Sequence, residues 1–321
     1  MRENKTDEQH TVSQEEFFDN FDTLAGELLS GGDISLGRFE EKLTEAYSRM
    51  TGICLENVCV WQMEDRLKCV VTDYYNEILW EREIPQDTSG LLLKYFGKEL
   101  ADEALDRKVS ETIDRMSGEI DTLIGSFARS SSVGGFCGIL KDIARKLEEK
   151  LCQEVPEAAG RIKVSVQMQN FETLECLAAV DSDTPYVIAM DKAQMKKAVM
   201  AVQERVEELY QEAKKAFLLR IGLYIERIAE RPDIDLEDMQ RILIRMYKDR
   251  TAGVDLADDI VLFVKDGYAG YMLFERHVIA DCEKLSGKAA DIIMGKFGNE
   301  CRRNGEEYAE ELEEYGWKRE G

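Results

Sequence analysis

The sequence predicts an α+β protein dominated by helices, in which long helices pack on short antiparallel strand clusters. Apolar residues recur at helical spacing over long stretches, and between these stretches the period changes to two in short runs. Only 4 prolines and 23 glycines interrupt the 321 residues, so long helices can form. With 44% hydrophobic residues, the chain has enough apolar material for a sizeable core.

The N-terminal part begins with a polar stretch, residues 1–12, which we expect to form a disordered leader. Ser13 and Glu16 form an S-x-x-E capping box that opens a helix, and Gly31-Gly32 ends this helix. A second helix follows. Its apolar residues lie on one face: Phe39, Leu43, Tyr47 and Met50.

Three short runs of period two come next, between residues 57 and 84, and predict a three-stranded antiparallel meander. A long helical stretch then runs from Pro85 to about Phe127. Its last part carries an apolar seam of the coiled-coil type, formed by Val109, Ile113, Met116, Ile120, Leu123 and Phe127. The glycine- and serine-rich stretch 125–135 favours a flexible linker over an anion-binding loop.

The same order of elements recurs after this stretch. A helix at 139–152 leads to strands at 161–168, 173–180 and 185–190. A helix of about forty residues is then expected from Asp191, which caps it, to Glu230, where Pro232 stops it. Its first half carries a second seam: Met195, Val199, Val202, Val206, Leu209, Ala213 and Ala216.

A third copy begins near Leu236, because Tyr247 and Thr251 match Tyr47 and Thr51. We therefore hypothesise a unit of helix, three strands and long helix, used two or three times at a spacing near 100 residues; convergent αβ packing is the alternative. The predicted division of the chain is a leader (1–12), a first α+β module (13–130), a second (136–232), and a mostly helical C-terminal region (233–321) with a hairpin at 259–279.

The charge balance is strongly acidic, with 65 acidic against 42 basic residues and a formal charge of −23. Such a surface repels nucleic acids and anionic membranes, so direct binding to either is not expected. Solubility is the plain explanation of this charge. The sharper hypothesis is that the acidic face binds a basic protein, including one that itself binds nucleic acid.

The cysteines and histidines exclude several kinds of site. None of the 8 cysteines forms a C-x-x-C pair, and only two histidines exist, so neither a zinc site nor a redox centre is encoded and no cofactor is expected. The N-terminus has no signal-peptide pattern, and no apolar run reaches membrane-spanning length. A cytoplasmic protein of a bacterium or phage fits these observations.

Three aspartates at predicted strand ends could converge on a divalent metal: Asp181, Asp183 and Asp191. The first two also fit a tight turn and the third a helix N-cap, and we favour that interpretation. His277, with Asp281 and Cys282 nearby, could form a nucleophilic pair. A single structural histidine is the favoured interpretation, because the sequence supplies no third member of such a site.

These observations favour a non-catalytic protein-binding or inhibitor protein whose acidic surface takes a basic partner. Exposed aromatic residues can anchor such a partner, and the candidates are Tyr74 and Tyr75 in a predicted turn and Trp317 in the acidic tail. The alternatives are a metal-dependent enzyme that uses the strand-end aspartates, and a ligand-sensing regulator with a pocket over a sheet. The heptad-like seams leave self-association open, although intramolecular packing explains them too.

Overall fold

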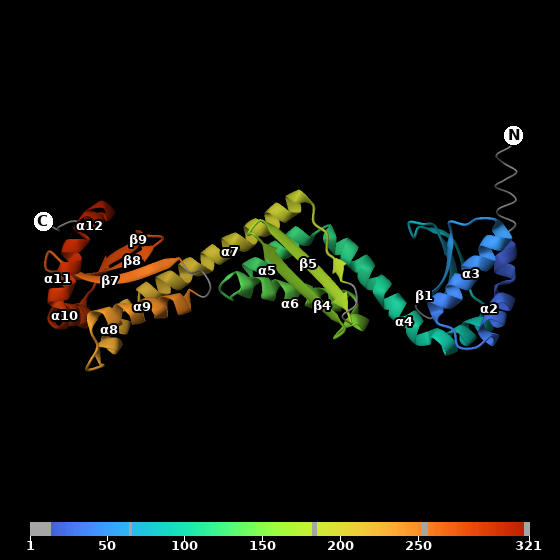
Figure 1. The fold of residues 1–321 in the computed structure, drawn as a ribbon, viewed down its shortest axis with the longest axis horizontal. Helices are drawn as coiled ribbons and strands as arrows, with labels where there is room; N and C mark the ends of the chain where they lie inside the picture. Colours follow the sequence, from blue (N-terminus) through green and yellow to red (C-terminus); the bar gives the residue numbers. More distant parts are fainter. Residues whose placement is uncertain (1–13, 64–65, 182–184, 252–255, 318–321) are drawn as a thin grey trace, which may run out of the picture. The chain divides into compact units, whose positions relative to one another are not determined.

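The computed structural model describes residues 14–63, 66–181, 185–251 and 256–317. It confirms the fold class, because helices alternate with three small antiparallel sheets of three strands each (Figure 1). The chain divides into two compact units, unit 1 (1–115 and 151–162) and unit 2 (116–150 and 163–321). The predicted leader and Ser13 of the predicted capping box lie outside the described residues.

The first sheet has its core on the face that the helices cover. Its elements are a short helix at 14–19, α2 (Phe21–Ser30), α3 (Leu36–Thr51), β1 (Asn57–Met63), β2 (Arg66–Thr72), β3 (Ile78–Glu83) and α4 (Gln86–Ser117). Helix α3 begins at Ser35, whose side chain accepts a hydrogen bond from the Arg38 amide, and ends at Gly52 in the left-handed conformation. Phe39 and Val60 are among the residues of this core.

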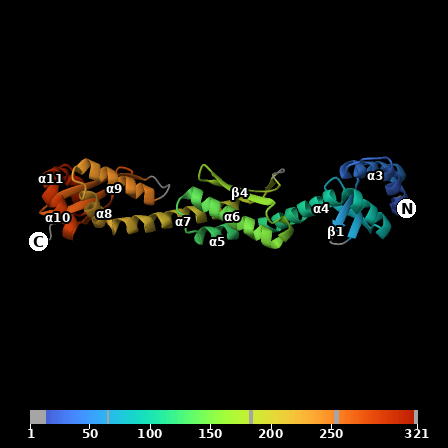
Figure 2. The same cartoon turned by 90° about the horizontal axis from the view of Figure 1, so that it is seen from below.

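The second set of elements repeats this order. It comprises α5 (Ile120–Arg129), α6 (Phe136–Glu154), a short 3₁₀ turn (Pro156–Ala158), β4 (Ile162–Gln169), β5 (Thr173–Val180), β6 (Tyr186–Val187) and α7 (Lys192–Leu218). Figure 2 shows α5 and α6 on the same side of β4. Asp191 caps α7 as predicted: its carboxylate accepts from the amides of Ala193 and Gln194, and the Gln194 side chain returns a bond to the Asp191 amide.

The third set has a complete sheet and more helices. It comprises α8 (Ile221–Ala229), α9 (Leu236–Arg250), β7 (Ala257–Lys265), β8 (Tyr268–Glu275), β9 (Val278–Lys284), α10 (Gly287–Lys296), α11 (Gly298–Glu307) and α12 (Ala309–Tyr315). The predicted Asp-Gly turn joins β7 to β8, with both Asp266 and Gly267 at positive φ. The third strand β9 extends the predicted hairpin into a meander.

This order of elements is consistent with the repeated unit that the sequence predicts. Helices α3, α6 and α9 begin at residues 36, 136 and 236, and each leads into a three-stranded sheet. Tyr47 and Tyr247 lie at matching places in the first and third copies, and both are fully buried. In each case the hydroxyl of the matching threonine, Thr51 or Thr251, donates to the tyrosine carbonyl.

The predicted continuous helix from Asp191 to Glu230 is wrong. Helix α7 ends at Leu218 and α8 begins at Ile221, with Arg220 at φ −113° between them. The stretch predicted as helical up to Phe127 breaks in the same way between α4 and α5, where Glu119 has φ −125°. Tertiary packing explains the break between α7 and α8, since α7 packs on α5 while the apolar residues of α8 belong to the core around the third sheet.

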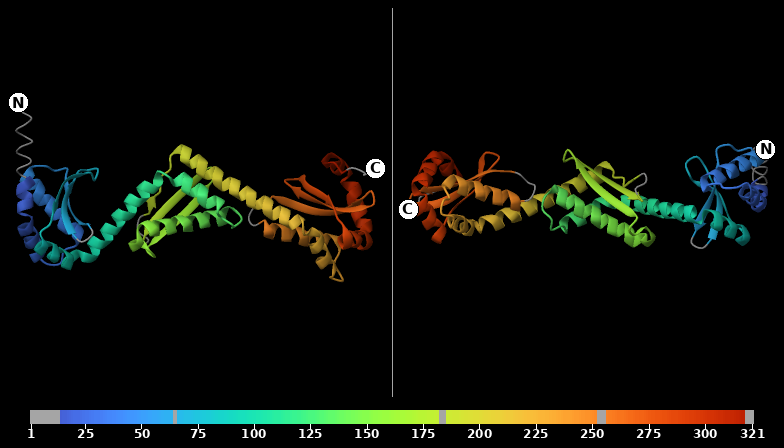
Figure 3. Two further views of the ribbon diagram at one scale, coloured as in Figure 1. Left: turned by 180° about the vertical axis from the view of Figure 1, so that it is seen from behind. Right: turned by 60° about the horizontal axis from the view of Figure 1, so that its bottom comes forward.

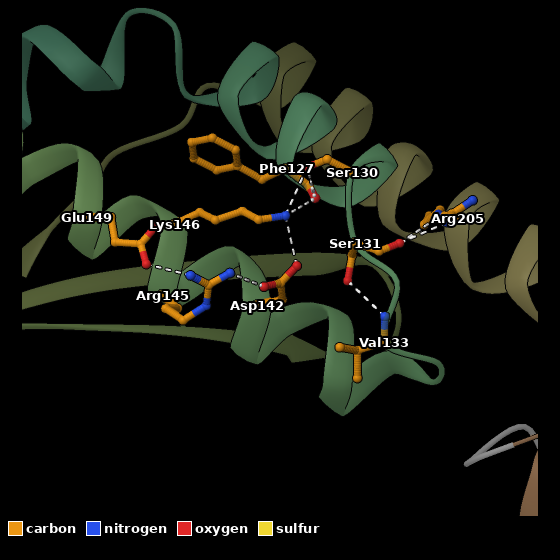
Figure 4. A network of polar contacts seen from close by, with 9 residues as sticks. All are labelled: Phe127, Ser130, Ser131, Val133, Asp142, Arg145, Lys146, Glu149 and Arg205. Atoms are coloured by element: carbon orange, nitrogen blue, oxygen red, sulfur yellow. Dashed lines mark hydrogen bonds and ion pairs between the residues drawn. The ribbon is translucent and has the colours of Figure 1, made fainter.

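The predicted flexible linker at 125–135 is also wrong. Residues up to Arg129 belong to α5, and Ser131 is buried. The guanidinium of Arg205 on α7 donates two hydrogen bonds to the Ser131 carbonyl, at 3.0 and 2.8 Å (Figure 4). The short loop after α5 is therefore held to α7.

A second group of contacts holds the same loop to α6. Lys146 donates to the Ser130 hydroxyl at 2.9 Å and to the Phe127 carbonyl at 3.3 Å, and its ammonium lies 2.8 Å from an Asp142 oxygen (Figure 4). The hydrogen bond from Lys146 lowers the pKa of Asp142 to about 2, so this ion pair persists at neutral pH. The glycine and serine content of 125–135 predicted a flexible linker. The structure instead orders this loop, because its hydroxyl and carbonyl groups accept hydrogen bonds from Lys146 and Arg205.

The third sheet buries apolar residues on both faces. One face, which includes Ile260 and Leu262, packs on α8, α9 and α10. The other face contributes Val261, Phe263 and Met272 to a smaller cluster with Leu312 of α12. Figure 3 shows the sheet between these two layers of helices. The side under α12 holds the cavity described below.

Candidate protein-binding sites

The predicted anchors Tyr74 and Tyr75 lie in the loop that joins β2 to β3. Their exposed fractions are 78% and 81%, and their rings meet edge to face with centroids 5.6 Å apart. One carboxylate oxygen of Asp73 accepts hydrogen bonds from the amides of Tyr75 and Glu77, each at 2.8 Å. The loop therefore presents two aromatic rings in an ordered backbone, which reduces the entropy lost on binding.

The third predicted anchor, Trp317, takes part in local packing. Its ring meets that of Phe263 edge to face with centroids 4.8 Å apart, and its amide donates to the Leu312 carbonyl at 2.8 Å. These contacts hold the end of α12 against β7. Trp317 belongs to unit 2 and the tyrosine pair to unit 1, so the three residues do not form one site within either unit.

A cavity of about 620 Å³ lies between β7 to β9 and α12, beside the packing of Trp317. Four carboxylates line it, Asp258 and Asp259 from β7 and Glu311 and Glu314 from α12. Its remaining lining is aromatic, aliphatic and one histidine: Val261, Phe274, His277, Val278, Ile279, Tyr308 and Tyr315. Among the described residues that line it, none is lysine or arginine.

The geometry of this cavity favours a cation with an apolar stem. The rings of Phe274 and Tyr308 lie 5.4 Å apart and are inclined by 49°, which gives an aromatic surface between the carboxylates. Burial raises the pKa of Tyr308 and Tyr315, and nearby carboxylates raise each pKa further. The Nδ1 atom of His277 lies 3.5 Å from Asp258, and the histidine side chain is 92% exposed. A lysine or arginine side chain fits such a lining, because it can combine ion pairing with contact to aromatic faces.

Those residues weighed for chemistry that the structure describes take other positions in the fold. The Asp191 carboxylate is occupied by the amides of α7, Asp181 follows β5 at positive φ, and Asp183 lies outside the described residues. His277 occupies the turn between β8 and β9, and burial raises the pKa of Cys282 to about 12, which opposes thiolate formation. In the part of the chain that the structure describes, no group of three or more acidic, histidine or cysteine side chains could hold a metal.

One titratable cluster was not predicted from the sequence. Glu40 on α3 lines a cavity of about 650 Å³ at the edge of β1, and burial raises the pKa of Glu40 to about 7. It accepts a hydrogen bond from the Val60 amide at 2.7 Å. Arg107 of α4 lies 3.9 Å from the Trp61 ring centroid. The only signal in the sequence is an acidic residue directly after the core residue Phe39, which is too common a pattern to indicate a site.

No protein-family model, curated protein or solved structure matches this chain. Within the described ranges, every helix is too short or too polar to cross a lipid bilayer.

Proposed function

We propose that this protein is a non-catalytic binding or inhibitor protein that takes a basic protein partner on its acidic surface. The observation that carries the proposal is the cavity beside α12, where four carboxylates surround an aromatic and aliphatic lining. A formal charge of −23 supports it, because long-range attraction speeds the encounter with a basic surface. We also propose a cytoplasmic location and a bacterial or phage source, since the sequence pattern favours both.

The two parts of this recognition have different physical roles. Exposed ion pairs at a solvated rim contribute only about 0–1 kcal/mol each, so the general charge of the surface provides rate and salt sensitivity more than affinity. The cavity can remove a partner's lysine or arginine from water on an aromatic surface, where a cation–aromatic contact is worth roughly 1–2 kcal/mol. Affinity is therefore expected to depend on the cavity, and the on-rate on the whole acidic surface.

The test uses a short fluorescein-labelled oligo-arginine peptide, with binding followed by fluorescence anisotropy at about 0.05 M and about 0.5 M NaCl. The double variant Glu311→Gln/Glu314→Gln removes two carboxylates of the cavity. Its matched control, Glu307→Gln/Glu310→Gln, removes the same charge at the same spacing from positions outside the lining. We expect the cavity variant to bind roughly tenfold more weakly than the control variant.

Equal affinities of the two variants, or affinities that do not change with salt, contradict the proposal. A small cation such as arginine amide is the comparison ligand: if it binds as tightly as the peptide, the cavity belongs to a ligand-sensing protein. If the partner binds nucleic acid, addition of this protein should displace it from a labelled DNA duplex.

A further inference from the structure

The edge strands of the three sheets are not equally covered by helices and side chains, and this difference indicates a second binding site. An edge strand presents backbone N–H and C=O groups that can pair with another chain unless something covers them. In the first sheet, β1 is covered by α3. The Thr44 hydroxyl accepts from the Val58 amide at 2.9 Å, and the Glu40 carboxylate accepts from the Val60 amide at 2.7 Å.

The corresponding edges in unit 2 carry the same protection. Gln240 of α9 accepts from the Leu262 amide of β7 at 2.9 Å, and Asn304 of α11 donates to the Leu262 carbonyl at 2.8 Å. In the second sheet, the Glu148 carboxylate accepts from the Val164 amide of β4 at 3.2 Å. In each of the three sheets, a helix side chain thus hydrogen-bonds to the backbone of the first strand.

The last strands of the second and third sheets are protected by other means. Strand β6 has only two residues, Tyr186–Val187. At β9, the Lys214 ammonium donates to the Ala280 carbonyl at 3.4 Å. Short edges and side-chain caps are both known ways to prevent strand addition.

Strand β3 lacks these protections. The Ile84 amide donates to the Leu67 carbonyl of β2, so by the alternation of an antiparallel ladder the backbone groups of Glu81 and Glu83 point away from β2. In the part of unit 1 that the structure describes, no strand pairs with the side of β3 that faces away from β2. No side chain of this part hydrogen-bonds to the backbone on that side. The strand has six residues, enough to pair with an incoming segment.

Exposed apolar side chains continue from the tyrosine loop onto this strand. Ile78 is 50% and Leu79 44% exposed, and only Asn76 and Glu77 separate them from the ordered pair Tyr74 and Tyr75. Trp80 is half-buried on the helix side of the sheet, where its ring lies 6.4 Å from that of Phe18. An incoming strand would find apolar contacts along the first half of β3.

The second half of β3 is acidic on the side away from the helices. Glu81 pairs with Lys68 of β2 at 2.8 Å, and Glu83 pairs with Arg66 at 3.1 Å, and both carboxylates remain about half exposed. Because Glu81 and Glu83 lie between β2 and the open edge, basic residues of a neighbouring strand could contact them from the other side. Cross-strand pairs of opposite charge stabilise such an arrangement.

We infer that β3 is a docking edge to which the basic partner adds an extended segment with alternating apolar and basic residues. Backbone hydrogen bonds to Glu81 and Glu83 supply the pairing, the apolar residues contact Trp80 on the helix side, and the basic residues face the two glutamates. Tyr74 and Tyr75 contact the end of the segment. The partner is the basic protein of the proposed function, on which this second site rests.

The test compares two variants of one position. Glu81→Pro removes the outward N–H group without removing a bond to β2, and proline is tolerated on an edge strand. Glu81→Ala removes the same carboxylate and keeps the N–H group. The probe is a fluorescein-labelled peptide of alternating valine and lysine, and its control has the same composition in two blocks. We expect the alternating peptide to bind Glu81→Ala about tenfold more tightly than Glu81→Pro, and the block peptide to bind the two variants equally, because its lysines reach only the cavity that both variants keep.

A second measurement does not depend on folding of the proline variant. Methylation of the peptide's backbone nitrogens at every second residue blocks one edge of the added strand. Two peptides are compared, one methylated at its valines and one at its lysines. One of them should lose binding to the natural protein and the other should keep it, because only one edge of the peptide faces β3. Equal binding of both registers, or of Glu81→Pro and Glu81→Ala, overturns the inference.

Two outcomes distinguish binding of the partner at β3 from self-association and from binding at the cavity. If Glu81→Pro converts a dimer of the protein into a monomer in analytical ultracentrifugation, the edge pairs with a second copy and the assigned partner is wrong. The cavity variant Glu311→Gln/Glu314→Gln serves as a control. If it binds oligo-arginine normally while Glu81→Pro still loses the alternating peptide, the cavity proposal fails and the β3 site stands.

Discussion

A buried carboxylate in the third set of elements allows a quantitative test of the structure. One oxygen of Glu275 on β8 accepts hydrogen bonds from the hydroxyls of Tyr210, at 2.5 Å, and Tyr247, at 2.9 Å. The Lys214 ammonium lies 3.1 Å from the same oxygen, and the Lys214 and Glu275 side chains are only 11% and 14% exposed. This group connects α7 and α9 to the sheet.

Replacing Glu275 with leucine leaves the Lys214 ammonium buried without its counter-ion. Breaking a buried pair by removing one partner costs about 3–5 kcal/mol, and we expect a value near 3 kcal/mol because the two tyrosine hydroxyls, 2.9 Å apart, can still bond to each other. The double variant Lys214→Met/Glu275→Leu should be more stable than Glu275→Leu, since it leaves no unpaired charge. Lys215→Met, an exposed neighbour on α7, should change stability by less than about 0.5 kcal/mol.

The effect should also depend on pH. Burial alone raises the pKa of Glu275, but the hydrogen bonds from Tyr210, Lys214 and Tyr247 outweigh it and hold the pKa below the ordinary value of 4.5. A depressed pKa gives stability that is fully present above pH 4.5 and is lost as the pH falls through the lower, folded-state pKa. The difference between the natural protein and Glu275→Leu should therefore shrink in acid.

Urea unfolding measures this prediction, with the fluorescence of Trp317 as the probe. The chain has three tryptophans, so Trp61→Phe and Trp80→Phe leave the one that packs on the third sheet. If Glu275→Leu lowers the free energy of unfolding by less than about 1 kcal/mol, the size of one ordinary hydrogen bond, the buried network is refuted. A double variant no more stable than Glu275→Leu also refutes it.

The remaining predictions concern local chemistry and packing. Because burial raises the pKa of Glu40 to about 7, its ionisation opposes folding, and urea stability of unit 1 should fall by up to roughly 3 kcal/mol between pH 4.5 and 7. Glu40→Gln should remove this dependence, and an unchanged pH profile would contradict it. Gly305→Ala should cost about 1–3 kcal/mol, since the new methyl group would clash with the Val264 carbonyl oxygen. Gly295→Ala, with open space around it, should stabilise by about 0.5–1 kcal/mol. Thermal unfolding compares the two variants, and equal changes count against the close packing of α11 on β7.

Elements defined by local chemistry could be predicted from the sequence. The N-cap at Asp191 lies where the sequence places it, because the cap depends on residues within one turn. The strands at 173–180 and the Asp-Gly turn at 266–267 are also confirmed, since alternation and turn chemistry are local signals. These signals specify which segments form helices and strands.

Breaks within helical stretches could not be predicted in this way. Phe217 and Ile221 keep the spacing of one helix across the break, so periodicity cannot detect it, and Leu219 and Arg220 are ordinary helix formers. The acidic cavity could not be predicted from the sequence either. Asp258 and Glu311 are more than fifty residues apart, and the packing of α12 on the third sheet, through Leu312 and Trp317, places them around one space.

In each of the three sheets an edge-strand amide that faces a helix needs a hydrogen-bond acceptor, and different residues supply it. This comparison explains why the edge of β3 can stay open. Glu40 and Gln240 lie at matching positions and accept from Val60 and Leu262, whereas in the second sheet Glu148 takes that role from a later turn of α6. An acceptor is present each time because an edge amide that faces a helix is removed from water and must find a partner. Among the described residues of unit 1, no helix side chain bonds to the outward amides of β3, and water can satisfy them until a chain displaces it. The open edge is therefore compatible with a stable fold, which a binding edge must be.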